Sequence, residues 1–272
     1  MIFFKKKNLA KVLKKPTEEV GRNYKKAILN KQSKFAFVES YKTARTNLIY
    51  SLSAEKDKCK KVIFTSSVPA EGKTTTCLNL AITFAQMGEK VVVLDSDLRK
   101  PKLHKCLDMN NEKGMSNYLA GLESAENVVQ KCEEHGFDVV TAGHIPPNPS
   151  ELLNSPKMEE LLTYLSERYN YIFLDMPPVD VVTDTVSVSK YATGVVLVVR
   201  ENYTHQELLK KAIESLEFAN AKILGIVLND IDNKMASKYK YSKYGYRYSY
   251  KYKYNYNYSY STDESEVDTA NK

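Results

Sequence analysis

One short segment carries the residue types that bind phosphate. Residues 66–75 read SSVPAEGKTT, follow the apolar run KVIFT and precede a stretch with helical apolar spacing. In such a P-loop, successive backbone N–H groups and the positive end of the following helix hold phosphate oxygens. Lys73 is expected to reach the β- and γ-phosphates, and the Thr74 hydroxyl to bind Mg²⁺. The expected nucleotide contacts are Val68, Pro69, Ala70, Glu71, Gly72, Lys73, Thr74 and Thr75.

Three carboxylates follow apolar runs and are candidates for holding a metal ion beside those phosphates. Asp95 and Asp97 come directly after the run VVVL, and Asp175 ends the run YIFLD. The carboxyl ends of parallel strands meet at one edge of a sheet, so these acids are expected to converge on the P-loop. We expect Asp97, Asp175 and Thr74 to lie around Mg²⁺.

The base is expected to be adenine, because the guanine-reading pattern NKxD is absent. The last apolar run ends instead in Leu228-Asn229-Asp230. Asn229 suits a hydrogen bond to the adenine edge, and a strand-ending asparagine that caps a turn is the alternative. The site as a whole therefore predicts Mg·ATP as its ligand.

The elements that must position these residues follow from hydrophobic patterning. The runs VVVLD, YIFLD and VVLVV lack polar alternation, which is typical of strands buried on both faces. Because strand and helix patterns alternate, the fold class is α/β, a mainly parallel β-sheet with helices on both faces. Strands are predicted at 61–65, 90–95, 137–141, 171–175, 194–200 and 223–229, and helices at 38–52, 73–87, 157–168 and 206–219.

Charge and composition divide the chain into three parts. Residues 1–34 carry eleven Lys or Arg against two Glu, and residues 234–272 carry eight against four acids, which leaves about −6 between them. We expect a basic flexible segment (1–34), a P-loop domain (35–232) and a low-complexity, disordered tail (233–272). Basic ends suit an anionic membrane surface and equally suit solvated tails. Four single cysteines and the lack of a bilayer-length apolar run predict a cytoplasmic protein.

The set of motifs resembles the bacterial tyrosine kinases (BY-kinases) of capsule and exopolysaccharide operons. The resemblance covers residues 35–232 and the tail, and it implies a P-loop NTPase fold of the partitioning-ATPase type. It rests on the P-loop, on Asp95, Asp97 and Arg99 as a DxDxR motif, and on Asp175 before two prolines. Partitioning ATPases have a lysine where this chain has Val68. The residues implied as catalytic are Lys73, Asp95, Asp97 and Asp175; Asp95 is implied as the proton acceptor, but spacing does not choose among the carboxylates.

The resemblance also implies self-association and partners. The family's ExxRxxR motif, which mediates ring-like assembly, is matched by Glu39, Lys42 and Arg45, with lysine in place of the middle arginine. This spacing places the three on roughly one helix face, and an ion-paired solvated face is the alternative. A homo-oligomer, a separate transmembrane activator of the polysaccharide co-polymerase type that recruits the kinase to the inner face of the membrane, and protein substrates in trans are implied. No nucleic acid is expected.

The tail is crowded with tyrosines, which from Tyr244 onward occupy every second position. An aromatic-faced edge strand is one alternative, and a basic arm on a membrane or single-stranded nucleic acid is another. The resemblance favours phosphoacceptors, because a kinase then supplies a reason for both the composition and the position. The expected acceptors are Tyr239, Tyr241, Tyr244, Tyr246, Tyr248, Tyr250, Tyr252, Tyr254, Tyr256, Tyr258 and Tyr260.

The function expected from the sequence is an ATP-dependent protein-tyrosine autokinase. It would phosphorylate the tail in trans between protomers and regulate capsular or exopolysaccharide synthesis and export. The alternative is a partitioning- or positioning-type P-loop ATPase switch whose basic aromatic tail binds membrane or nucleic acid. A polysaccharide export scaffold without catalysis is disfavoured by the intact Lys73 and the three acids. Formation of phosphotyrosine separates the kinase from the switch.

Overall fold

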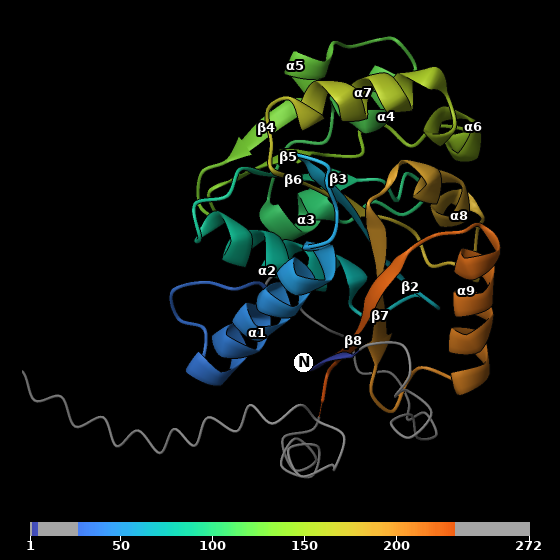
Figure 1. The fold of residues 1–272 in the computed structure, drawn as a ribbon. Helices are drawn as coiled ribbons and strands as arrows, with labels where there is room; N and C mark the ends of the chain where they lie inside the picture. Colours follow the sequence, from blue (N-terminus) through green and yellow to red (C-terminus); the bar gives the residue numbers. More distant parts are fainter. Residues whose placement is uncertain (1, 5–26, 232–272) are drawn as a thin grey trace, which may run out of the picture. The chain divides into compact units, whose positions relative to one another are not determined.

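The strands of the protein form one mixed sheet. The computed structural model describes residues 2–4 and 27–231 of the 272-residue chain. Within these residues the sheet is eight-stranded, in the order β1-β8-β7-β2-β6-β3-β5-β4 (Figure 1). The strands are β1 (Ile2–Phe4), β2 (Lys60–Ser66), β3 (Val91–Asp95), β4 (Val129–Cys132), β5 (Phe137–Val140), β6 (Tyr171–Asp175), β7 (Gly194–Arg200) and β8 (Ile223–Asn229).

The middle of the sheet is parallel, and the two outer strands are antiparallel to their neighbours. β2 pairs in parallel with β6 and β7, β3 with β5 and β6, and β7 with β8. β1 and β4 pair antiparallel with β8 and β5. The carboxyl ends of β2, β3, β6, β7 and β8 therefore meet at one edge, which is where ligands bind in open α/β sheets.

Helices cover both faces of this sheet. In Figure 1, α1 and α2 lie on one side of β7 and β8, and α9 lies on the other. The elements are α1 (Phe35–Leu52), α2 (Lys73–Ala85), α3 (Leu103–Leu107), α4 (Met115–Leu119), α5 (Ala125–Val128), α6 (Pro149–Leu153), α7 (Pro156–Ser166), α8 (Asp184–Val188), the 3₁₀ turn η3 (Ser189–Tyr191) and α9 (Gln206–Phe218).

Aromatic packing fixes the P-loop helix α2 against the sheet. Phe84, near the end of α2, lies edge-on to Phe173 of β6, with ring centroids 5.4 Å apart. Phe173 in turn contacts Phe64 of β2 at 5.0 Å. All three side chains are fully buried. Burial of such large apolar side chains is the main stabilising contribution to this layer and holds both ends of the P-loop.

The α/β fold predicted from the sequence is confirmed, and all the predicted strands and long helices are present within a few residues. The expectation that 1–34 is flexible needs correction within the described residues. Residues 2–4 form β1 along the edge of β8, and Ile28 and Leu29 are buried in the core. Asn79 of α2 holds Leu29 in the core, because its side-chain oxygen accepts the Leu29 N–H at 2.8 Å. The predicted tail lies outside the described residues.

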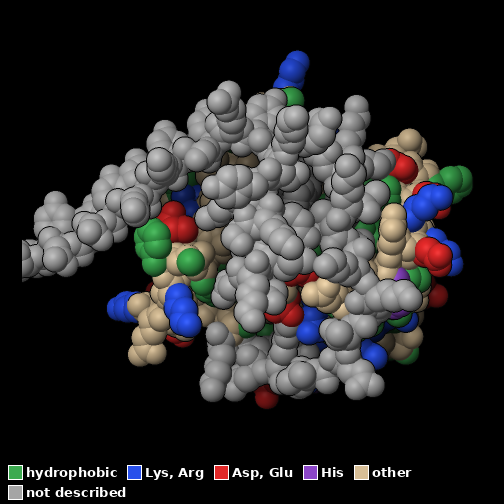
Figure 2. Space-filling model, turned by 90° about the horizontal axis from the view of Figure 1, so that it is seen from below, with side chains coloured by type: hydrophobic (Ala, Val, Ile, Leu, Met, Phe, Trp, Pro, Cys, Tyr) green, Lys and Arg blue, Asp and Glu red, His purple; other side chains and the backbone are tan. Residues whose placement is uncertain are grey.

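Charges are mixed on the part of the described surface that Figure 2 shows. On the face in Figure 2, acidic and basic side chains of the described residues are interspersed, so the negative excess of the body does not form a single patch in that view. Among residues 2–4 and 27–231, no helix has the length and apolar character needed to cross a bilayer.

Candidate active site

The P-loop joins the carboxyl end of β2 to the start of α2. Two of its residues have left-handed backbone conformations, Ala70 at φ 66° and Gly72 at φ 94°. A Cβ on Gly72 would lie 2.1 Å from the Asn229 side-chain nitrogen, so glycine is required there. Gly72 immediately precedes the thirteen-residue helix α2, whose first-turn N–H groups and dipole favour an anion.

The backbone N–H and carbonyl groups of Val68 both form hydrogen bonds within the P-loop. Its N–H donates to Glu71 Oε2 at 2.9 Å, and its carbonyl oxygen accepts the Ser66 hydroxyl at 2.8 Å. Pro69 has no N–H to offer. In this conformation neither Val68 nor Pro69 has a free backbone N–H to offer to a phosphate, and the predicted contacts of residues 70–75 stay a prediction.

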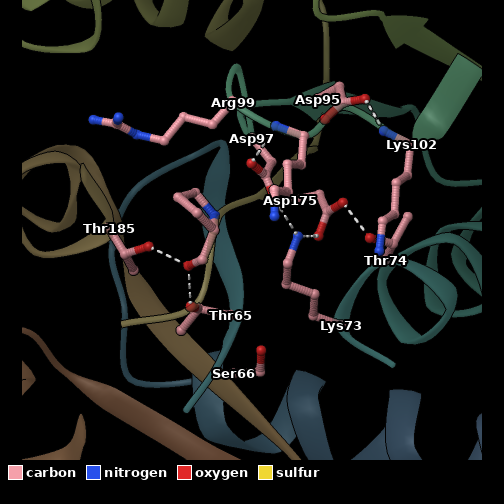
Figure 3. A network of polar contacts seen from close by, with 12 residues as sticks. Thr65, Ser66, Lys73, Thr74, Asp95, Asp97, Arg99, Lys102, Asp175 and Thr185 are labelled. Carbon is pink, nitrogen blue, oxygen red and sulfur yellow. Dashed lines mark hydrogen bonds and ion pairs between the residues drawn. The ribbon is translucent and has the colours of Figure 1, made fainter. Parts of the chain in front are cut away.

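Lys73 lies between two carboxylates that come from neighbouring strands. Its Nζ is 3.1 Å from Asp97 Oδ2 and 3.3 Å from Asp175 Oδ1 (Figure 3). The Thr74 hydroxyl donates to Asp175 Oδ2 at 2.6 Å. Asp95 and Asp175 are direct cross-strand partners of β3 and β6. The structure thus brings together the lysine, the threonine and the acids that the motifs predicted.

Asp95 is held through one of its two carboxyl oxygens. Its Oδ2 accepts the backbone N–H groups of Lys102 at 3.1 Å and Leu103 at 2.9 Å, where α3 begins. Its Oδ1 is buried and has no hydrogen-bond partner among the described residues. An acceptor oriented in this way and left unsatisfied suits a proton or a hydroxyl donor.

Burial and mutual repulsion perturb the titration of these groups. Burial, followed by the charge of Asp175, raises the pKa of the Asp95 carboxyl. Burial also raises the pKa of Asp175, against the opposing effect of Lys73. For Lys73 burial acts to lower the pKa, but the carboxylates, Asp175 first, more than offset it and the pKa is raised. Lys73 is therefore charged, and it partly neutralises a concentrated negative site.

The oxygen atoms of this site suit Mg²⁺, which needs only one or two ligands from the protein. Within the described residues no three His, Cys, Asp or Glu side chains converge as a complete metal site. Thr74 and Asp175 offer a hydroxyl and a carboxylate side by side. Mg²⁺ typically takes one or two protein oxygens and completes its shell with phosphates and water.

Two further groups brace the loops that carry the acids. The hydroxyls of Thr65 and Thr185 both donate to the Pro177 carbonyl oxygen at 2.7 Å, which holds the chain just after Asp175. Arg99, the last residue of DxDxR, points away from the acids in Figure 3.

Arg99 instead binds a buried aspartate that the sequence did not single out. Its Nε donates to Asp184 Oδ2 at 2.9 Å and its Nη2 to Oδ1 at 3.3 Å. The Ser150 hydroxyl also donates to Asp184, at 2.6 Å. The Asp184 side chain is 1% exposed and that of Arg99 38%. No local pattern marks Asp184 or Ser150, because each meets Arg99 only through the tertiary fold.

Asn229 lies against the P-loop, whereas the predicted self-association residues lie on α1. The Asn229 amide donates to the Glu71 carbonyl oxygen at 3.1 Å, so its side chain contacts the P-loop, and its contact with adenine stays a prediction. On α1, Lys42 forms an ion pair with Glu39 at 2.8 Å, whereas Arg45 donates to the Thr83 carbonyl oxygen of α2. The tail tyrosines lie outside the described residues.

Comparisons with known proteins agree on one class. A ParA family model, described as NUBPL iron-transfer P-loop NTPase, matches residues 58–255. The chain is 40% identical to the tyrosine-protein kinase YwqD of Bacillus subtilis, covering 75% of this chain and 85% of YwqD. It is 34% identical to the putative tyrosine-protein kinase CapB of Staphylococcus aureus, covering 75% and 88%.

A solved structure places the same family on this fold. The kinase domain of Escherichia coli tyrosine kinase ETK aligns with a TM-score of 0.69 at 34% identity, covering 71% of this chain and 75% of that one. The chain therefore belongs to the bacterial tyrosine-protein kinases, built on a ParA-type P-loop NTPase domain.

Proposed function

We propose that this chain is an ATP-dependent tyrosine kinase that phosphorylates the tyrosine cluster of its own C-terminal tail. The observation that carries the proposal is the placement of Lys73 between Asp97 and Asp175, with Thr74 bonded to Asp175. A cation, a hydroxyl and carboxylates beside a P-loop are the parts that phosphoryl transfer from ATP requires. Its relatives YwqD and CapB are named tyrosine-protein kinases.

Each group of residues in the site has a separate role in phosphoryl transfer. The N–H groups of residues 70–75 and the start of α2 hold the phosphates, and Lys73 neutralises charge on the transferred group. Thr74 and Asp175, with Asp97 nearby, would hold Mg²⁺, and the ion would shield the charge of the phosphate oxygens. Such a site acts mainly by positioning and charge neutralisation, because the transition state of phosphoryl transfer is loose.

We assign proton acceptance to Asp95. Its Oδ2 is fixed by two backbone N–H groups, which leaves Oδ1 for the tyrosine hydroxyl. The raised pKa brings this carboxyl closer to the tyrosine pKa of about 10 than an ordinary aspartate would be. Asp95→Asn is expected to lower kcat with little change in the affinity for Mg·ADP. Equal kcat losses in Asp95→Asn and a Glu159→Ala control would refute the assignment.

We propose the tail as the acceptor because of its tyrosine-rich sequence. Phosphorylation of all eleven tyrosines between 239 and 260 would add roughly −17 to −22 charges. Residues 234–272 start from +4, so their charge would be reversed. We propose that unphosphorylated tails dock at acidic sites of neighbouring protomers and that phosphorylated tails are repelled.

Transfer between protomers can be tested with two complementary variants. The acceptor is full-length Lys73→Met, which keeps the tail but loses the catalytic lysine. The donor is the chain ending at residue 232, which keeps Lys73 but has no tail. Phosphate on the acceptor's tail after mixing with Mg·ATP supports trans transfer. If the wild-type chain phosphorylates its tail but the mixture of donor and acceptor shows no phosphate, transfer occurs within one protomer.

Self-association is proposed to use the α1 face with Glu39 and Lys42. Arg45 is a poor probe, because it binds the carbonyl end of α2 in its own protomer. Exchange of Lys42 for Glu tests the face more cleanly, since the Lys42 side chain pairs only with the partly exposed Glu39 among the described hydrogen bonds and ion pairs. The variant should sediment as a smaller species. An unchanged sedimentation coefficient would argue against this face.

The wider setting is also a proposal. We propose that the kinase regulates capsular or exopolysaccharide synthesis and export, and that a separate transmembrane activator recruits it to the inner face of the membrane. Adding the activator's cytoplasmic segment should increase phosphotyrosine formation. The ParA-type domain keeps a positioning ATPase switch as the second candidate. That switch would hydrolyse ATP without forming phosphotyrosine.

A further inference from the structure

The Glu71 carboxyl is a buried acid inside the P-loop that phosphoryl transfer does not use. The residue is 0% exposed and lies between the two left-handed residues Ala70 and Gly72. Its Oε2 accepts the Val68 N–H at 2.9 Å, which closes the first half of the loop on itself. An acid beside a polyphosphate site is electrostatically unfavourable, so its placement there needs a compensating role.

The other carboxyl oxygen of Glu71 reaches a different part of the sheet. Oε1 accepts the Thr204 hydroxyl, which in turn accepts the Arg200 N–H at 2.8 Å. Thr204 is buried in the turn between β7 and α9. The Asn229 amide at the end of β8 donates to the Glu71 carbonyl oxygen. Glu71 is thus tied to the ends of both β7 and β8.

These bonds anchor the P-loop on the side opposite to the acids. Lys73 and Thr74 attach the second half of the loop to the ends of β6 and β3. Glu71 attaches the first half to β7 and β8. A left-handed alanine such as Ala70 is strained by about 1–2 kcal/mol and persists only where surrounding contacts hold it.

We propose that Glu71 is a positioning residue: together with Thr204 it holds the P-loop in its phosphate-binding arc before the nucleotide arrives. The inference rests on the proposed nucleotide site and gives that site a preformed shape. Burial raises the pKa of the Glu71 carboxyl to about 7, against the effect of the Thr204 hydrogen bond, and so weakens its negative charge next to the phosphates. Preorganisation lowers the cost of ordering the loop on binding, so affinity is where the effect is expected.

The first test reads the loop without any nucleotide. Amide hydrogen exchange of residues 66–72 is compared in the full chain and in Glu71→Ala, Thr204→Val and Thr204→Ser. Loss of a buried hydrogen bond predicts exchange about tenfold faster in Glu71→Ala. Thr204→Val should behave similarly, and the hydroxyl of Thr204→Ser should restore slow exchange. Exchange as slow as in the wild type in both Glu71→Ala and Thr204→Val overturns the proposal.

The second test measures Mg·ADP affinity by calorimetry on the same chains, with Glu159→Ala, an exposed glutamate of α7, as the matched control. Kd is expected to rise about tenfold in Glu71→Ala and in Thr204→Val, and kcat at saturating ATP should be nearly retained in Thr204→Val. A loss confined to kcat overturns the proposal. If Glu71→Ala does not fold, the two Thr204 variants decide. The exchange test needs no nucleotide, so failure of the wild type to bind Mg·ADP would refute the proposed function alone.

Discussion

Removing Arg99 should destabilise the fold more than removing its buried partner, Asp184. In Arg99→Ala the Asp184 carboxylate keeps only the Ser150 hydroxyl among the bonds described, while it remains 1% exposed. In Asp184→Ala the arginine, already 38% exposed, can turn to water. The asymmetry arises because an unpaired charge is costly only where water cannot reach it.

The magnitudes follow from the lost bonds. Breaking a fully buried ion pair from one side costs about 3–5 kcal/mol, and partial exposure of Arg99 reduces this to about 3 kcal/mol for Arg99→Ala. Asp184→Ala loses charge-assisted hydrogen bonds to a solvated partner, about 1.5 kcal/mol. For a domain of about 200 residues these correspond to Tm decreases of roughly 6–12 °C and 3–6 °C. The double variant leaves no buried charge and should resemble Asp184→Ala.

Thermal unfolding of the four chains without nucleotide, followed by circular dichroism, measures this order. Arg99 and Asp184 are coupled favourably if the double variant is more stable than Arg99→Ala alone. Arg99→Ala should also lower kcat, since the loop carrying Asp97 is released. An Arg99→Ala chain as stable as Asp184→Ala, or strictly additive losses, would refute the reasoning that Asp184 is held by Arg99.

Three other predictions follow from the loop and its surroundings. Gly72→Ala should weaken Mg·ADP binding at least tenfold by calorimetry, and adding Asn229→Ala should recover only part of the loss, because the clash disappears but the left-handed strain of about 1–2 kcal/mol stays. The Glu71 pKa in the fold, about 7 against an ordinary 4.5, means that its stabilisation is fully present below pH 4.5 and is lost as the pH rises to about 7. Urea unfolding from pH 4.5 to 8 should therefore show wild type losing on the order of 3 kcal/mol relative to Glu71→Gln, and parallel curves would contradict this. Lys42→Arg should strengthen self-association in sedimentation equilibrium, because arginine adds bidentate geometry, and unchanged association would exclude a role for this position.

The sheet and the grouping of the candidate site residues could be predicted because their signals are local. Buried parallel strands are continuous apolar runs, and P-loop residues are adjacent in the chain. The convergence of Asp95 and Asp175 followed from one rule, that parallel strands end at a common edge. The family resemblance then supplied the roles of these residues.

The supporting contacts could not be predicted, because they join residues that are distant in the chain. Glu71 meets Thr204 across 133 positions, and Arg99 meets Asp184 across 85. Neither pair has a periodic or motif signal. Arg45 shows a second limit: helical spacing placed it on roughly the same face as Glu39 and Lys42, but its side chain donates to the Thr83 carbonyl oxygen near the end of α2. β1 was hidden by its three-residue length beside a lysine run.

The central claim, tyrosine phosphorylation of the tail, is tested most directly by the intact mass of the purified chain before and after Mg·ATP. The control is Lys73→Met, with its fold checked by thermal unfolding, and the activator's cytoplasmic segment is added in parallel. The account predicts several added phosphoryl groups that map to the tyrosines between 239 and 260 and are absent from the control. ATP hydrolysis without any added phosphate, with the activator segment present, would contradict it and favour the positioning ATPase.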